Sequence, residues 1–120
     1  CTSSLLISFC YRVIAKSRIT SIKHALLLGV KECVIRKLEN ETTKFSSAAS
    51  FSDSNLYSGY LISHTGTNTC FNAVAKSKGI SILPNFKIVL DTKTGILERS
   101  CWPSSIHNII SIGCSNSGTW

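Results

Sequence analysis

The chain has 120 residues, of which 43% are hydrophobic and 16% charged, and its formal net charge at pH 7 is +7. This length fits one domain with a buried core, and the apolar content excludes a chain that is disordered throughout. The excess of Lys and Arg permits an anionic partner, such as nucleic acid, an acidic glycan or lipid headgroups, without selecting one. No apolar run approaches the roughly 18 residues that span a bilayer, so no transmembrane segment is expected.

The first residues of the chain allow several interpretations. The chain contains no Met, which suits a processed product, a fragment or an out-of-frame product. Residues 1–4 resemble the mature start of a bacterial lipoprotein, whose first cysteine carries the lipid. Residues 4–9 are also compatible with the remnant of a signal-peptide core. For residues 4–9 we favour an ordinary buried strand.

Residues 12–28 are predicted to form an amphipathic helix. At 100° per residue, apolar side chains from Ile14 to Leu26 fall within one arc of the helix. Three cations cluster together outside this arc: Arg12, Lys16 and Lys23. Arg18 is the exception, because it points into the apolar arc. It must extend its guanidinium to solvent or pair with a buried acid, or the register of the helix is shifted.

Two segments are expected to interrupt regular structure in the first half of the chain. Gly29 offers a stop or kink, after which residues 30–38 continue as a second short helix. Residues 42–58 are rich in Ser and Thr, whose hydroxyl groups compete for backbone hydrogen bonds. We therefore predict a loop or internal linker at 42–58.

The second half of the chain changes to an alternating apolar period, which predicts antiparallel strands. The predicted strands are residues 61–63, 69–71, 80–90, 96–99 and 106–112. Turns at residues 64–68 and 91–95 would close two hairpins, and Pro84 indicates an edge strand or a bulge. The predicted fold is α+β in a single domain of residues 1–120: an N-terminal amphipathic helical segment followed by an antiparallel sheet of about four or five short strands.

Six cysteines are spread widely along the chain: Cys1, Cys10, Cys33, Cys70, Cys101 and Cys114. Their even number and wide spacing favour disulfides, although fifteen pairings are possible and six buried, reduced thiols are the alternative. A zinc site built from Cys70, Cys101, His107 and Cys114 is disfavoured, because no pair of ligands lies within a few residues of each other. We assign no metal site.

Catalytic residue types are present, but they form no recognisable arrangement. The three His residues and two Asp residues can be combined with C-terminal serines in a triad order, which is expected by accident in a chain so rich in serine. The G-x-S-x-G elbow and phosphate-binding glycine loops are absent from the sequence. We assign no catalytic residue and no cofactor.

The candidate site for an anion or partner is the basic face of the predicted helix, formed by Arg12, Lys16 and Lys23, with Lys31 beyond the glycine. The alternative is a solvated face of a helix that packs on the core. The sequence thus predicts a small, basic, non-enzymatic binding module, stabilised by disulfides and located outside the cell or in the secretory pathway. The alternatives are an intracellular nucleic-acid-binding protein with reduced cysteines, and a fragment or out-of-frame product without independent function.

Overall fold

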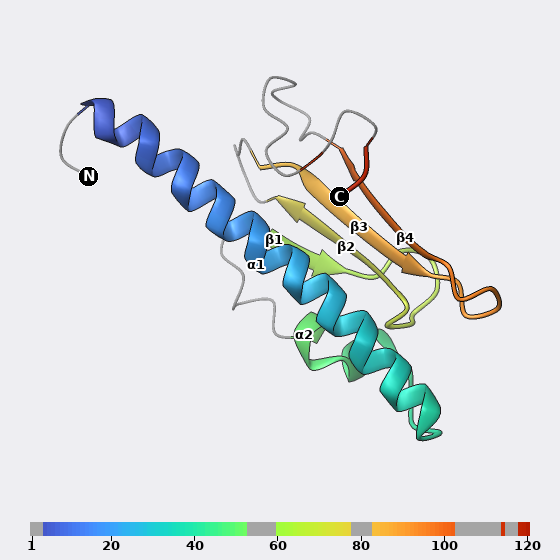
Figure 1. Ribbon diagram of the computed structural model, residues 1–120. Coiled ribbons are helices and arrows are strands. Elements are labelled where there is room, and N and C mark those ends of the chain that lie inside the picture. Colours follow the sequence, from blue (N-terminus) through green and yellow to red (C-terminus); the bar gives the residue numbers. More distant parts are fainter. Residues whose placement is uncertain (1–3, 53–59, 78–82, 103–113, 115–117) are drawn as a thin grey trace.

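The computed structural model describes residues 4–52, 60–77, 83–102, 114 and 118–120, with the side chains of residues 4–15 and 52 excepted. In chain order the elements are α1 (Ser4–Leu38), η1 (Phe45–Ser47), α2 (Ala49–Ser52), β1 (Tyr60–Ser63), β2 (Asn72–Ser77), β3 (Asn85–Leu90) and β4 (Leu97–Trp102). A helix followed by a four-stranded antiparallel sheet confirms the predicted α+β class (Figure 1).

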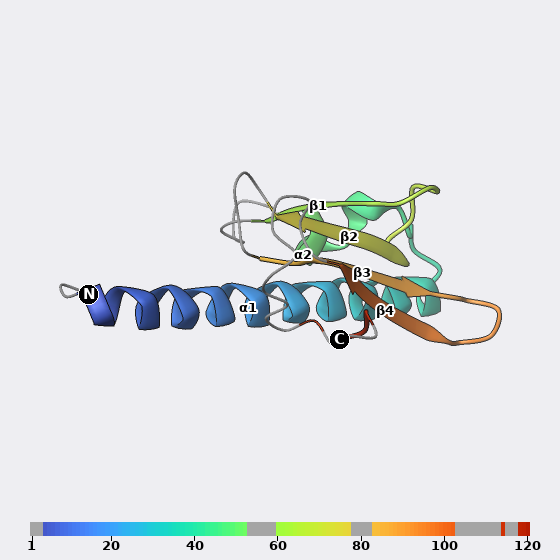
Figure 2. The ribbon, with the colours of Figure 1, turned by 90° about the horizontal axis from the view of Figure 1, so that it is seen from above.

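Helix α1 has 35 residues, which corresponds to a length of about 52 Å. Its C-terminal half lies across one face of the sheet, and its N-terminal half extends beyond the sheet (Figures 1 and 2). The strand predicted for residues 4–9 is therefore wrong. An apolar run of this length does not distinguish a strand from a helix by its period alone, and no Gly or Pro separates it from the helical residues that follow.

Gly29 does not interrupt α1, contrary to the predicted stop or kink. A Cβ atom at this position would overlap with the Phe51 ring of α2. The glycine therefore allows α2 to approach the backbone of α1 closely, while the hydrogen-bonding pattern of the helix continues through it.

The four strands pair in sequence order, and every pair is antiparallel. The predicted hairpin around the turn at 91–95 is present as β3 and β4. In the first hairpin β1 pairs instead with β2 at Asn72–Ser77, so the strand predicted for residues 69–71 is wrong. The Asn72 side chain explains this shift, because it accepts the Thr65 backbone N–H at 2.7 Å and donates to the Thr69 hydroxyl at 3.0 Å. These bonds keep residues 64–71 in a loop. The predicted strands at 80–82 and 106–112 lie outside the described residues.

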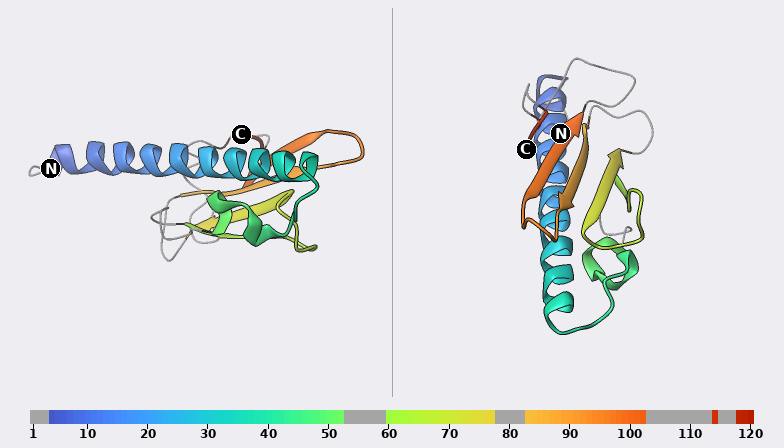
Figure 3. Two further views of the ribbon diagram at one scale, coloured as in Figure 1. Left: turned by 90° about the horizontal axis from the view of Figure 1, so that it is seen from below. Right: turned by 90° about the vertical axis from the view of Figure 1, so that its right-hand side faces the viewer.

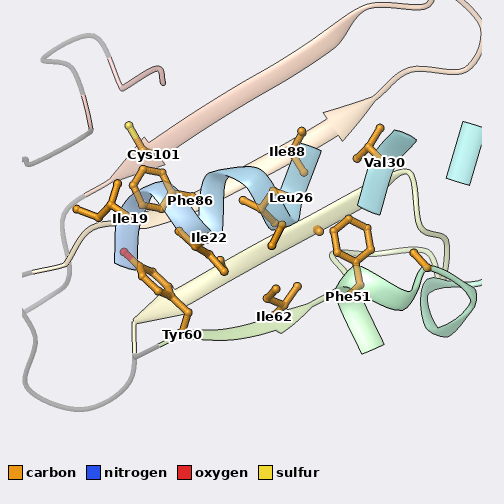
Figure 4. Close-up of a cluster of buried hydrophobic side chains, with 14 of the residues drawn as sticks. Ile19, Ile22, Leu26, Val30, Phe51, Tyr60, Ile62, Phe86, Ile88 and Cys101 are labelled. Carbon is orange, nitrogen blue, oxygen red and sulfur yellow. The ribbon is translucent and has the colours of Figure 1, made fainter. Parts of the chain in front are cut away.

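The core lies between α1 and the sheet, with α2 closing one end (Figures 3 and 4). Helix α1 contributes Ile19, Ile22 and Leu26, which are all buried, as the predicted apolar arc requires. Arg18 is exposed. Because its side chain is exposed, Arg18 needs no buried partner.

The segment predicted as a loop at 42–58 is partly helical, since it contains η1 and α2. Ala48 and Phe51 of this segment are buried, and the Phe45 and Phe51 rings stack with their centroids 5.1 Å apart. Apolar burial therefore outweighs the preference of the serines for a loop. Residues 53–58 lie outside the described part.

Two disulfides are present among the described residues. Cys33 of α1 is bonded to Cys70 in the loop before β2, and Cys101 of β4 is bonded to Cys114. The reduced-cysteine alternative is wrong for these four positions, and their sulfur atoms are not available as zinc ligands. Cys1 and the side chain of Cys10 lie outside the described part. The chain is a small, disulfide-stabilised α+β module.

Candidate anion-binding site and outer surface of α1

The structure does not gather the four predicted cations into one site. Lys16 and Lys31 are exposed, Lys23 is half-buried, and the Arg12 side chain lies outside the described part. On a regular helix, Lys16 and Lys23 are about 20° apart, whereas Lys31 is turned about 80° away from Lys23. Of the three described cations, only Lys23 lies against the aromatic side chains of the body.

Lys23 lies beside two aromatic rings and a second cation. Its Nζ atom is 5.5 Å from the centroid of the Phe86 ring and 5.9 Å from that of the Trp120 ring. The Arg99 guanidinium carbon is 5.5 Å from the same Trp120 centroid. Arg99 reaches this place because it pairs with Ile88, which is buried under α1, and paired residues share a face of the sheet.

Trp120 is held in a fixed orientation by backbone groups of the sheet. Its indole N–H donates to the Ser100 carbonyl at 2.9 Å and to the Lys87 carbonyl at 3.2 Å. Next to it, the Cys101 backbone N–H donates to the Gly118 carbonyl at 2.9 Å. The C-terminal residues therefore form one wall of a pocket against α1.

This pocket, which we call the basic pocket, has a volume of about 260 Å³. It is lined by Thr20, Lys23, His24, Leu27, Arg99 and Trp120. No side chain in its lining carries a carboxylate, and neither Lys23 nor Arg99 forms an ion pair with another described residue. Burial, together with the nearby Arg99 charge, lowers the pKa of Lys23 below its usual value.

A second pocket, which we call the mixed pocket, lies further along α1 and has a volume of about 430 Å³. It too places a lysine over an aromatic ring, since the Lys37 Nζ atom is 5.6 Å from the Phe71 centroid. In contrast to the basic pocket, its lining includes a side-chain carboxylate, Asp91. The Lys93 backbone N–H, 2.9 Å from this carboxylate, lowers the pKa of Asp91.

The side of α1 that faces away from the sheet is also partly apolar. Leu28 and Ile35, seven residues apart, are both exposed. We call these two side chains the outer row of α1. They belong to neither the buried core nor the lining of the basic pocket.

Sequence reasoning identified Lys23 but missed Arg99, Trp120 and the outer row. Trp120 joins the site only because the C-terminal residues return to β4, and no local pattern predicts that return. The outer row, by contrast, has a signal that was present in the sequence, namely apolar residues at a spacing of seven.

No group of three or more His, Cys, Asp or Glu residues that could hold a metal ion occurs within the described part of the chain. Among the same residues, no helix is both long and apolar enough to cross a membrane. Comparisons with known protein families, with curated proteins and with solved structures find no match to this chain.

Proposed function

We propose that this protein is a small, basic, non-enzymatic binding module that acts outside the reducing cytosol and docks to a second copy of itself through the outer row of α1. The observation that carries the proposal is that α1 is apolar on two sides. Its inner side is covered by the sheet. On its outer side, Leu28 is 49% exposed and Ile35 46%.

A helix with apolar residues on two sides is typical of one that packs on two sides. Exposed apolar residues that follow one another along a surface, unlike scattered ones, favour an interaction site. Leu28 and Ile35 lie two turns apart on the same side of α1. The row therefore supports docking of an elongated partner along the helix axis.

The spacing of the row favours another helix as that partner. Leu28 and Ile35 are seven residues apart, and helices that pack side by side in coiled coils repeat an apolar position at this spacing. A lipid surface does not require this spacing, and the outer side of α1 also carries the exposed residues His24 and Lys31.

A second copy supplies a helix of matching length and pattern. The other described helices of the chain have three and four residues, so only α1 offers such a surface. Charge also supports a partner of the same kind. Residues 12–31 contain five Lys or Arg and no acid, whereas residues 32–41 contain three Glu beside Arg36 and Lys37 and so have a net charge of −1. A staggered or antiparallel pair of copies brings these two stretches together.

The two disulfides support the compartment that we propose. Bridges such as Cys33–Cys70 and Cys101–Cys114 persist in oxidising environments and are rare in the reducing cytosol. The intact mass of the protein isolated without reductant should be lower than that of the reduced protein, since each bridge removes two hydrogens. Six free thiols in the isolated native protein would contradict this part of the proposal.

Sedimentation equilibrium of the purified chain tests the docking surface. We expect the wild type to associate reversibly, and Leu28→Gln with Ile35→Gln to be monomeric at the same concentrations. The matched control is Leu61→Gln with Ile96→Gln, which changes two equally exposed apolar residues of the sheet region. The control should associate like the wild type.

Two results would contradict docking through the outer row. One is a wild type that stays monomeric up to about 1 mM, which would leave less than about 4 kcal/mol of association free energy. The other is a control pair that dissociates as fully as the outer-row pair, because association would then follow total apolar exposure and not this surface.

A further inference from the structure

The basic pocket holds two like charges near one another, and neither forms an ion pair with a described residue. Lys23 and Arg99 both lie over the Trp120 ring, and no side chain in the lining carries a carboxylate. The π-face of an indole attracts cations, but it does not neutralise them. Even when the α-carboxylate of Trp120 is counted, the two cations leave the pocket with a net positive charge that an anion from outside can compensate.

The geometry of the pocket is suited to a carboxylate on an organic body. Arg99 offers a planar set of donors that matches a carboxylate in two-point contact, and Lys23 adds a point charge. Leu27 and Trp120 supply apolar walls beside these charges. Inorganic phosphate is strongly hydrated, and the apolar walls cannot replace the hydrogen bonds that it would lose to water. Thr20 supplies the only hydroxyl group in the lining.

The rigidity of the site favours binding without a large rearrangement. The two bonds from the indole N–H to the Ser100 and Lys87 carbonyls fix the ring before any ligand arrives. Preorganisation of this kind reduces the entropy that a ligand loses on binding. The half-buried position of Lys23 also strengthens its attraction to an anion relative to a fully solvated lysine.

We infer that the basic pocket binds the carboxylate group of a small organic acid or of an acidic sugar, with Lys23 and Arg99 as the anion ligands and Trp120 and Leu27 against its body. This site goes beyond the proposed docking function, because it lies on the flank of α1 and does not include the outer row. Failure of one proposal therefore leaves the other standing.

The test is a titration of the isotope-labelled full chain, followed through the indole N–H signals in NMR spectra. The probes are benzoate and glucuronate, their neutral counterparts benzyl alcohol and glucose, and inorganic phosphate. We expect saturable shifts of the Trp120 signal with at least one carboxylate and with neither neutral compound. Trp102 lies outside the pocket lining and serves as an internal control.

The variants assign the effect to the two cations. Lys23→Gln and Arg99→Gln should each weaken binding roughly tenfold or more, the usual size for loss of a hydrogen bond to a charged group. Lys37→Gln is the matched control, since it removes a lysine over an aromatic ring from the mixed pocket, which has its own carboxylate. It should leave the affinity unchanged. Each variant must retain the dispersed spectrum of the wild type.

The relative affinities identify the source of the carboxylate. Tighter binding of glucuronate than of benzoate would indicate an acidic sugar, and the reverse order a small aromatic acid. The proposal is overturned if neither carboxylate saturates the Trp120 shift below about 10 mM. Such a result would mean a binding free energy weaker than about 3 kcal/mol. It is also overturned if phosphate binds more tightly than both, or if Lys37→Gln weakens binding as much as Lys23→Gln.

Discussion

On the inner side of α1, Ile22 and Leu26 are completely buried against the sheet, whereas on the outer side Leu28 and Ile35 are about half exposed. Both sides carry Leu and Ile on the same helix. The difference is that the sheet covers only the inner side. The inner side therefore contributes to the stability of the fold, and the exposed outer side is the surface that we propose for docking. Substitutions can separate these two roles.

A matched pair of leucines should show the largest contrast. Leu26→Ala leaves a cavity in the core, so the free energy of unfolding should fall by about 2–5 kcal/mol. Leu28→Ala removes the same atoms from an exposed site and should change it by no more than about 0.5 kcal/mol. Urea unfolding of dilute protein measures both. Equal losses for the two variants would show that the outer side is also packed within one molecule.

Gly29→Ala should also destabilise the fold, by about 1–3 kcal/mol, because the added methyl group overlaps with the buried Phe51 ring. Helix propensity acts in the opposite direction, favouring Ala over Gly by about 1 kcal/mol. The sign of the change thus decides which effect dominates. Ser21→Ala, at an exposed position of the same helix, is the control and should be neutral or slightly stabilising. A stabilised Gly29→Ala variant would contradict the close approach of α2.

A smaller effect is expected from Lys23 at alkaline pH. Because burial and Arg99 lower the pKa of Lys23 in the folded state, the unfolded chain binds more protons between this lowered pKa and the ordinary value of 10.5. The free energy of unfolding of the wild type should therefore rise with pH through this range, relative to that of Lys23→Met. Parallel denaturation series of the two proteins measure the difference. A difference in unfolding free energy that does not change with pH would contradict a lowered pKa of Lys23.

Local patterns predicted much of this fold. The inner side of α1 followed from the period of Ile19, Ile22 and Leu26, and the turn at 91–95 followed from its Asp and Gly residues. Gly29 shows where such reasoning fails. The residue is needed because the Phe51 ring of α2 packs against it, and a local pattern does not predict this contact. The strand predicted at residues 4–9 failed because a short apolar run has no distinctive period.

The candidate sites were less predictable than the fold. Lys23 was identified by its charge, but its partners Arg99 and Trp120 come from the other end of the chain and meet it only through tertiary packing. The pairing of Cys33 with Cys70 could not be chosen from fifteen arrangements by spacing. Interactions between elements far apart in the sequence thus determine both the pocket and the bridges.

The most direct measurement of the central claim is an isotope-filtered NOE experiment on a mixture of labelled and unlabelled chains. It detects contacts between two copies and ignores contacts within one. Docking through the outer row predicts intermolecular NOEs from the methyl groups of Leu28 and Ile35, and none from the buried methyl groups of Leu26. Intermolecular NOEs confined to Leu61 or Ile96, or none at concentrations where the protein associates, would contradict the account.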